Sequence, residues 1–134
     1  MNVDIKELIL NQKNYNEIFT KNVNIDDYVK KITLFATIIT YYSENKLKGF
    51  IAYYSNNSDG LAFLTMIMVD NEIKREKLGS FLLMCSINDL KRKGFVNYRL
   101  EVLKSNINAI KFYEKFGFSI EENRDNCFLM NFNL

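Results

Sequence analysis

Histidine is absent from this chain of 134 residues, and so are proline and tryptophan. The lack of histidine excludes Ser-His and Cys-His nucleophilic pairs and the HExxH zinc motif. Proton transfer in an enzyme of this composition would fall to Tyr, Asp, Glu, Lys, Cys, the main chain or water. The two cysteines, Cys85 and Cys127, are too few for a disulfide framework or a zinc knuckle, and Cys85 lies in an apolar helical pattern typical of a core. We therefore expect no metal site.

A strong charge of either sign and a long apolar run are also lacking. The formal net charge is +2, so the composition gives no electrostatic reason to expect a nucleic acid partner. The longest apolar run, Leu61 to Val69, is interrupted by Thr65 and is far too short to span a bilayer. The N-terminus shows neither the basic start nor the apolar block of a signal peptide. These absences predict a cytoplasmic protein without a membrane partner.

Apolar residues make up 48% of the chain and aromatic residues 14%, enough to predict one domain over residues 1–134 with a genuine core. Residues 4–31 predict one or two short helices, with Asn24 as a helix cap. Strands are expected at Leu34–Tyr42, Lys48–Ser55 and Leu61–Asp70, the first two as a hairpin and the third after a turn at 56–60. The apolar spacing then changes to that of a helix over Leu78–Lys93. A strand at 96–104, a helix at 107–116 and two short strands near 118–122 and 127–132 complete the expected order.

The segment from strand 61–70 through helix 78–93 to strand 96–104 predicts a right-handed crossover that makes its two strands parallel. The predicted fold class is therefore α/β with a mixed sheet. Its first strands are antiparallel, one join is parallel, and its last strands are antiparallel again.

The loop from Asp70 to Ser80 is a candidate anion site. Backbone N–H groups at a helix start, beside Lys74, Arg75 and Lys77, suit a ligand such as a pyrophosphate. The loop also follows a parallel strand, where ligands of such sheets tend to bind. An ordinary solvated loop is the alternative, because Glu72 and Glu76 offset part of the positive charge.

Two further residues have a chemical and a structural explanation. Tyr113 shares a helical face with Ala109, Ile110 and Phe116, so it could be a packed aromatic, or its hydroxyl could reach the gap between the parallel strands. A phenol titrates near pH 10 and so carries a proton at neutral pH, which suits the protonation of a departing thiolate. Glu101 lies in the middle of a strand and could act as a general base, or as a surface residue near Arg99.

The stretch 61–118 resembles the core of the GNAT superfamily of acetyl-CoA-dependent N-acetyltransferases. Residues 105–118 are similar to the family's Asn-x-x-Ala…Phe-Tyr-x-x-x-Gly-Phe segment, in which Asn106 and Tyr113 would lie beside the cofactor. The family's Arg/Gln-x-x-Gly-x-Gly/Ala motif falls on Lys74 to Gly79, where only the final glycine is kept. Lys77 replaces the middle glycine, and a lysine tolerates fewer backbone conformations than a glycine.

The resemblance implies that acetyl-CoA lies in a V-shaped opening between strands 61–70 and 96–104. Its pantetheine arm would pair with the main chain of Ile67, Met68 and Val69, where a bulge would leave an N–H for the thioester oxygen. An amine would lose a proton to Glu101, Asp70 or water, and Tyr113 would protonate the CoA thiolate. The other implied cofactor contacts are Lys74, Arg75, Glu76, Lys77, Leu78, Gly79, Ser80, Asn106, Ala109 and Phe112.

The expected function is transfer of an acetyl group from acetyl-CoA to a primary amine, as in a small molecule such as an amino sugar or a polyamine. Two alternatives stay open: acetylation of a protein N-terminus or lysine, and a GNAT-shaped interaction module that binds an acyl-CoA weakly or not at all. The altered glycine motif favours the module, and the intact segment around Asn106 and Tyr113 opposes it. Exposed strands such as Leu34–Tyr42 or Cys127–Phe132 could pair across a homodimer.

Overall fold

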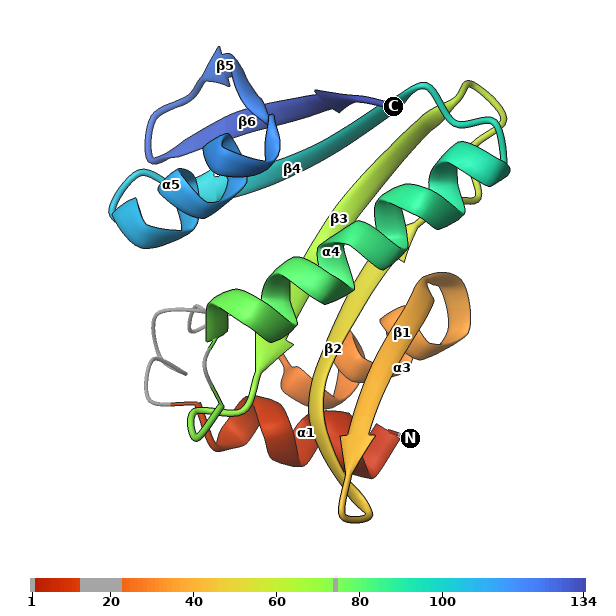
Figure 1. Cartoon of the computed structure of the whole chain (residues 1–134), viewed down its shortest axis with the longest axis vertical. Helices are drawn as coiled ribbons and strands as arrows, with labels where there is room; N and C mark the ends of the chain where they lie inside the picture. Colours follow the sequence, from red (N-terminus) through yellow and green to blue (C-terminus); the bar gives the residue numbers. More distant parts are fainter. Residues whose placement is uncertain (1, 13–22, 74) are drawn as a thin grey trace.

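The computed structural model describes residues 2–12, 23–73 and 75–134, with Arg75 and Glu76 described by their backbone (Figure 1). Its helices are α1 (Asn2–Leu10), α3 (Ile25–Phe35), α4 (Arg75–Arg92) and α5 (Ile107–Phe116). Its strands are β1 (Thr37–Ser43), β2 (Lys46–Tyr54), β3 (Leu61–Val69), β4 (Asn97–Leu103), β5 (Ser119–Asn123) and β6 (Cys127–Asn133). The helical prediction for residues 13–22 and the predicted cofactor contact Lys74 lie outside the described residues.

The six strands form one sheet in the order β1-β2-β3-β4-β6-β5. Strands β3 and β4 are parallel, and the other neighbouring pairs are antiparallel. Helix α4 makes the connection between the parallel strands, as the period change in the sequence predicted. The predicted mixed α/β sheet is confirmed.

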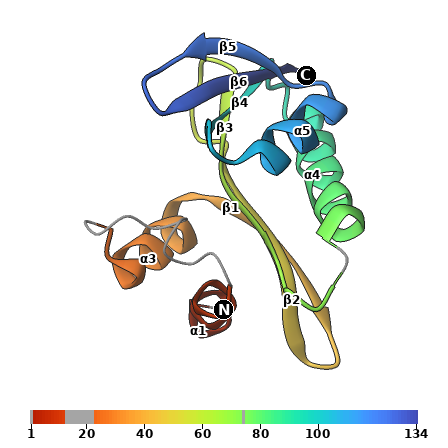
Figure 2. The same cartoon turned by 90° about the vertical axis from the view of Figure 1, so that its left-hand side faces the viewer.

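Helices cover both faces of the sheet (Figure 2). Helices α4 and α5 pack on one face over a core that includes Tyr53, Leu82 and Tyr98, all fully buried. Helices α1 and α3 pack on the other face over a second core that includes Ile5, Ile32 and Phe50. The two faces of the sheet are therefore covered by different helices and different cores.

Helix α3 begins where the sequence predicts and ends later than predicted. Its start is as predicted, because the Asn24 side chain accepts a hydrogen bond from Asp27 N at 3.1 Å and caps the helix. Its end corrects the predicted strand Leu34–Tyr42, because Leu34 and Phe35 are helical and strand β1 begins at Thr37. Val29 and Ile32 are buried on one helical face and leucine is a good helix former, so the exposed pair Leu34-Phe35 continues that helix.

Helix α4 starts three residues earlier than predicted, at Arg75 instead of Leu78. The charged residues before Leu78 suggested a loop, but Arg, Glu and Lys are good helix formers. Lys77, Leu78, Gly79 and Ser80 are therefore residues of the first turns of α4. The predicted loop after β3 is reduced to a short turn in which the Asp70 side chain accepts a hydrogen bond from Glu72 N at 3.0 Å.

Two buried tyrosines fix α4 to the sheet. The Tyr53 hydroxyl donates to Asp89 Oδ2 at 2.6 Å, and the Tyr98 hydroxyl donates to Ser86 Oγ at 3.0 Å. Burial raises the pKa of both tyrosines, so both hydroxyls stay donors. Burial alone would raise the pKa of Asp89, but the hydrogen bonds from Tyr53 and Lys93 lower it below its usual value. The orientation of α4 is thus set by polar contacts as well as by packing.

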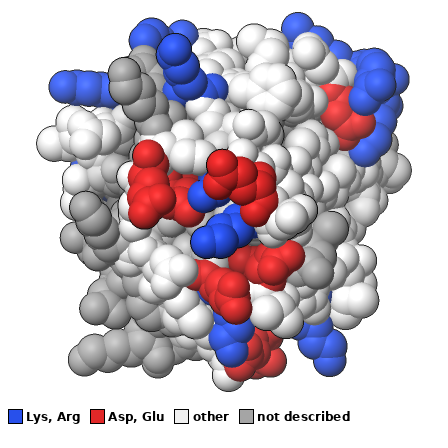
Figure 3. All heavy atoms as spheres, turned by 60° about the horizontal axis from the view of Figure 1, so that its bottom comes forward, with Lys and Arg blue, Asp and Glu red and all other residues white. Residues whose placement is uncertain are grey.

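Figure 3 views the molecule with the side of α1 and the β1–β2 turn brought forward. Acidic and basic side chains are interspersed on this face. One pair, Lys6 of α1 and Asp26 of α3, joins the two helices at 2.7 Å between Nζ and Oδ1. Within the described ranges, none of the helices combines the length and apolar content needed to cross a bilayer.

Candidate functional site

Strands β3 and β4 separate in the middle of the sheet. Their parallel register runs from Leu61 opposite Asn97 to Leu64 opposite Leu100, whereas β3 continues to Val69 and β4 to Leu103. The register between β2 and β3 shifts at the same point, so Thr65 is the extra residue of a β-bulge. The predicted bulge at Ile67–Val69 is thus corrected to Thr65, because Ile67, Met68 and Val69 pair regularly with β2.

The stretch of β3 beyond the bulge is where the main-chain contacts of a ligand were predicted. Ile67 and Val69 belong to the core under α4, whereas Met68 belongs to the core under α1 and α3. The Val69 carbonyl accepts a hydrogen bond at 3.1 Å from Nε2 of Gln12, a buried residue that the sequence analysis did not find. This bond joins segments 57 positions apart, so no local pattern could have revealed it.

Tyr113 lies on the face of the sheet that α4 and α5 cover. It is buried on α5, and its ring contacts those of Phe112 and Phe118 at centroid distances of 5.4 and 5.6 Å. Gly117 ends the helix with φ of 113°, and Phe118 N donates to the Tyr113 carbonyl at 3.1 Å. The helix end and the aromatic cluster together fix the position of Tyr113.

Asn106 and Ala109 lie at the start of α5 and form its cap. The Asn106 side chain accepts a hydrogen bond from Ala109 N at 3.2 Å. The predicted cofactor contacts Asn106, Ala109 and Phe112 therefore share one rigid helix with Tyr113. Capping explains an asparagine at position 106 on structural grounds, independently of any ligand.

The first turns of α4 lie close to both the sheet and α5. A Cβ at Gly49 of β2 would come within 2.9 Å of Leu78 Cδ2 and 3.1 Å of the Met68 carbonyl, so this glycine lets α4 approach the sheet. A Cβ at Gly79 would lie 3.5 Å from Phe112 Cζ, an ordinary contact. Gly79 therefore has space for a methyl group, and packing does not require a glycine there.

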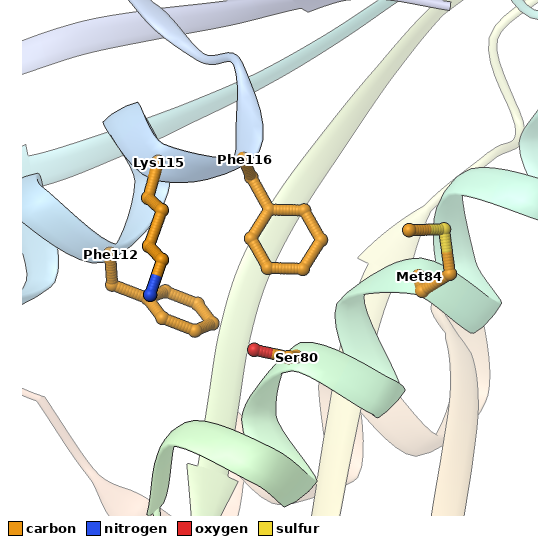
Figure 4. Close-up of a pocket in the computed structure, with 5 residues that line it drawn as sticks. All are labelled: Ser80, Met84, Phe112, Lys115 and Phe116. Atoms are coloured by element: carbon orange, nitrogen blue, oxygen red, sulfur yellow. The ribbon is translucent and has the colours of Figure 1, made fainter.

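A groove of about 310 Å³ lies between α4 and α5. Figure 4 shows Phe112, Lys115 and Phe116 extending from α5 toward Ser80 and Met84 of α4. Ser80 and Phe112 were predicted from the sequence, whereas Met84, Lys115 and Phe116 were not. Each of these three residues lies one helical turn from Ser80 or Phe112 in the sequence. This spacing could have identified them. The groove joins apolar rings with an amino group.

Glu101 lies on the other face of the sheet, one residue beyond the last residue of β4 that pairs with β3. It is directly opposite Leu129 of β6, which in turn is opposite Glu122 of β5. Arg124 spans this row, with Nη1 2.8 Å from Glu101 Oε1 and Nε 3.0 Å from Glu122 Oε1. The hydrogen bond from Arg124 lowers the pKa of Glu122. Glu101 is thus at the opening of the strands, exposed, and oriented by Arg124.

A second ion pair lies beside Glu101 on the same face. Arg99 Nε is 2.9 Å from Glu121 Oε1, at an angle that makes an ion pair without a hydrogen bond. The register shift between Ile120 and Glu122 makes Glu121 a bulge residue, so two successive glutamates reach one face. Among the described residues, no group of three or more Cys, Asp or Glu side chains is placed to hold a metal ion.

Comparison with known proteins gives a family from the sequence and a common fold from the structure. The family model described as Acetyltransferase (GNAT) family matches residues 7–118. The spermidine N(1)-acetyltransferase of Thermoplasma acidophilum is 28% identical over 128 residues, which cover 94% of this chain and 71% of that protein. The ribosomal protein bS18-alanine N-acetyltransferase of Salmonella typhimurium is 43% identical over 58 residues, which cover 43% of this chain and 39% of that protein.

Among solved structures, the PaiA N-acetyltransferase from Thermoplasma acidophilum in complex with coenzyme A has a TM-score of 0.80 with this chain. The two chains are 21% identical, and the likeness covers 99% of this chain and 92% of that one. At this identity the likeness shows a common fold, including the mixed sheet.

Proposed function

The chain belongs to the acetyltransferase (GNAT) family, and on this premise we propose that it transfers the acetyl group of acetyl-CoA to a primary amine of a small molecule. The predicted family, the acyltransferase class and acetyl-CoA as acyl donor are confirmed. The amine, the roles of individual residues and a one-domain organisation over residues 1–134 remain proposals.

The observation that carries the proposal is the separation of β3 from β4 after Leu64 and Leu100. It leaves the main chain of Ile67, Met68 and Val69 without a β4 partner among the described residues, in the position where an extended ligand could pair as an added strand. Tyr113 and Glu101 lie on opposite faces of the sheet beside this opening. Such an arrangement lets a proton leave the amine on one face and reach the leaving group on the other.

In the proposed reaction the amine attacks the thioester directly, in a complex that holds both substrates. Main-chain N–H groups near the bulge at Thr65 stabilise the negative charge that develops on the thioester oxygen. Glu101, with Asp70 or water as alternatives, takes the proton of the amine, and Tyr113 protonates the departing thiolate. Asp70 accepts a hydrogen bond from Glu72 N and Glu101 accepts one from Arg124, so hydrogen bonding does not distinguish the two carboxylates.

The remaining proposed contacts hold other parts of acetyl-CoA, including its pyrophosphate. Helix α4 presents Lys77, Leu78, Gly79 and Ser80 in its first turns, after Lys74, Arg75 and Glu76 in the chain. Helix α5 presents Asn106, Ala109 and Phe112. The groove between these helices adds Lys115, whose ammonium suits a phosphate.

A protein N-terminus is the second candidate acceptor. The bS18-alanine N-acetyltransferase is the relative with the higher identity, 43%, although over 58 residues, whereas the spermidine N(1)-acetyltransferase matches over 128. The longer match favours a small amine. A catalytically weak interaction module is a third candidate, supported by Lys77 in place of a glycine.

The proposal is tested by a thermal-shift titration followed by an amine panel. Acetyl-CoA binds the folded state, so at 100 times its Kd it should stabilise the protein by about 2.7 kcal/mol. Spermidine, an aminoglycoside and a peptide beginning with alanine are then compared by release of free CoA thiol. Release with spermidine or the aminoglycoside supports a small amine, and release with the peptide alone supports the second candidate. No melting shift at millimolar acetyl-CoA would favour the interaction module.

A further inference from the structure

The part of β3 that does not pair with β4, residues 65–69, is held at both ends by side chains from the layer that contains α1 and α3. At its start, the Tyr28 hydroxyl of α3 lies 2.9 Å from Thr65 Oγ1. At its end, Gln12, which follows α1, donates from Nε2 to the Val69 carbonyl at 3.1 Å. Both contacts come from the N-terminal part of the chain, whereas the groove with Lys115 lies between α4 and α5 on the other face.

The contact at Thr65 lies where β3 stops pairing with β4 and where its register with β2 shifts. Thr65 is the extra residue of the bulge, and Leu64 is the last residue of β3 that pairs with β4. The bulge also changes which face the strand presents, because Leu64 belongs to the core under α4 and Met66 packs against the core under α1 and α3. A change in the side chain that holds Thr65 would therefore reorient the main chain that follows.

Tyr28 is built to act as a fixed neutral hydrogen-bonding group. Burial raises its pKa to about 12, and the hydrogen bond with Thr65 offsets only part of that effect. Its ring packs at the edge of the second core together with Met66 and Tyr54. Gln12 is equally constrained, because the residue is 5% exposed and its side chain also donates to the Leu8 carbonyl at 3.4 Å.

We propose that Tyr28 and Gln12 are positioning residues for acyl transfer, which fix the main chain of residues 65–69 in the orientation that meets the thioester oxygen. This inference rests on the proposed function, since it assigns the geometry of the proposed main-chain contacts to two side chains of the N-terminal layer. Donors that stabilise developing charge must be held rigidly before the reaction. A strand segment with a neighbour on one side requires additional restraints to be rigid.

The test compares six variants in steady-state kinetics with acetyl-CoA and the amine found in the panel. Tyr28→Phe and Thr65→Val each remove one hydroxyl of the pair, and the double variant removes both. Tyr54→Phe is the matched control, because it removes a hydroxyl from the same cluster without touching Thr65. Thr65→Ser keeps the hydroxyl and should retain the wild-type kcat.

The expected result is a loss of about tenfold in kcat for Tyr28→Phe and for Thr65→Val, the effect of one hydrogen bond, with KM for acetyl-CoA within about twofold of wild type. The double variant should lose no more than the worse single variant, because both changes break one contact. Gln12→Leu should also lower kcat more than it raises KM.

Wild-type kcat in both single variants overturns the inference, as do losses that multiply in the double variant or that fall on KM alone. If Tyr28→Phe does not fold, Thr65→Val and Thr65→Ser are compared instead. Equal kcat values in these two variants would exclude a role for the Thr65 hydroxyl. A wild-type protein that acetylates no amine of the panel rejects the proposed function itself, and the inference with it. Failure of the inference alone leaves an active wild type with unaffected variants.

Discussion

At the scale of single residues, Tyr113 is the side chain on which the proposed chemistry depends most. Tyr113→Phe removes the proton donor and keeps the ring that packs on Phe112 and Phe118. We expect turnover to fall about 10²-fold or more, the usual contribution of a general acid, with acetyl-CoA affinity nearly unchanged. Steady-state kinetics together with a thermal-shift titration measure both quantities. A folded variant with wild-type turnover would remove Tyr113 from the mechanism.

Gly79 offers a second test at this scale, because stability and binding should change in opposite directions. A glycine inside a helix costs about 0.5–1 kcal/mol relative to alanine, and the added Cβ would meet Phe112 at an ordinary 3.5 Å. Gly79→Ala should therefore leave the free energy of unfolding unchanged or raise it, while it weakens acetyl-CoA binding.

Gly49→Ala is the contrasting variant for Gly79, since its Cβ would lie 2.9 Å from Leu78 Cδ2 and 3.1 Å from the Met68 carbonyl. This overpacking should destabilise the protein by about 1–3 kcal/mol. Urea unfolding of both variants gives the comparison. Equal destabilisation by the two substitutions would show that Gly79 is retained for packing.

The sequence predicts residues whose role depends on a local motif and misses those whose role depends on distant contacts. Asn106 and Tyr113 are found because a cap, a helical face and a terminal glycine follow one another within one segment. Arg124, Gln12 and Tyr28 act across 23, 57 and 37 positions, so no short pattern marks them. The roles of Glu101 and Tyr113 in catalysis stay predictions.

At the scale of helices and strands, the order of elements is predicted correctly and their boundaries less so. Leu34 and Phe35 were assigned to a strand from their side chains, but tertiary packing of Val29 and Ile32 keeps them in α3. The sequence predicts the bulge near Ile67, whereas it lies at Thr65. It follows directly after Leu64, the last residue of β3 that pairs with β4. Such positions depend on register between strands, which the sequence of one strand does not contain.

The contact between α4 and β2 gives a pH-dependent prediction at this scale. The pKa of Asp89 in the folded state lies below its ordinary value of 3.8. Its contribution to stability is therefore fully present above pH 3.8 and is lost as the pH falls through the lowered folded-state value. Asp89→Asn should thus be less stable than wild type at pH 7, and the difference should shrink toward pH 3.

Urea unfolding at both pH values measures the difference for Asp89. Tyr53→Phe, which removes the hydrogen bond at 2.6 Å, should diminish the same pH dependence. A difference between Asp89→Asn and wild type that stays constant from pH 7 to pH 3 would contradict the assignment.

At the scale of the whole molecule, the two edges of the sheet have different chemistry. Strand β5 carries Glu121 and Glu122 and is exposed along its length, which discourages pairing with other chains. Strand β1 holds no charged residue and exposes Tyr41 and Tyr42. This contrast supports the proposal of a homodimer in which two copies of β1 pair.

Light scattering coupled to gel filtration tests that proposal. Wild type should elute as a dimer, and Tyr41→Lys, which adds a charge to the uncharged edge, should shift it toward a monomer. The matched control Ile120→Lys places the same charge on β5, at a side chain of similar exposure (46% against 41%), and should change nothing. A monomeric wild type at micromolar concentration would reject the dimer.

The short seam between β3 and β4 has a mechanical consequence. Four residue pairs, from Leu61–Asn97 to Leu64–Leu100, hold the three N-terminal strands to the three C-terminal strands. This pairing alone resists separation of the two halves only weakly, and the core under α4, to which both halves contribute, supplies the rest of the resistance. Amide hydrogens of residues 65–69 and 101–103 should then exchange early, and a bound acyl-CoA should slow both sets together. The separation of β3 from β4 thus leaves a gap in the hydrogen bonding of the sheet that the proposed substrate would fill.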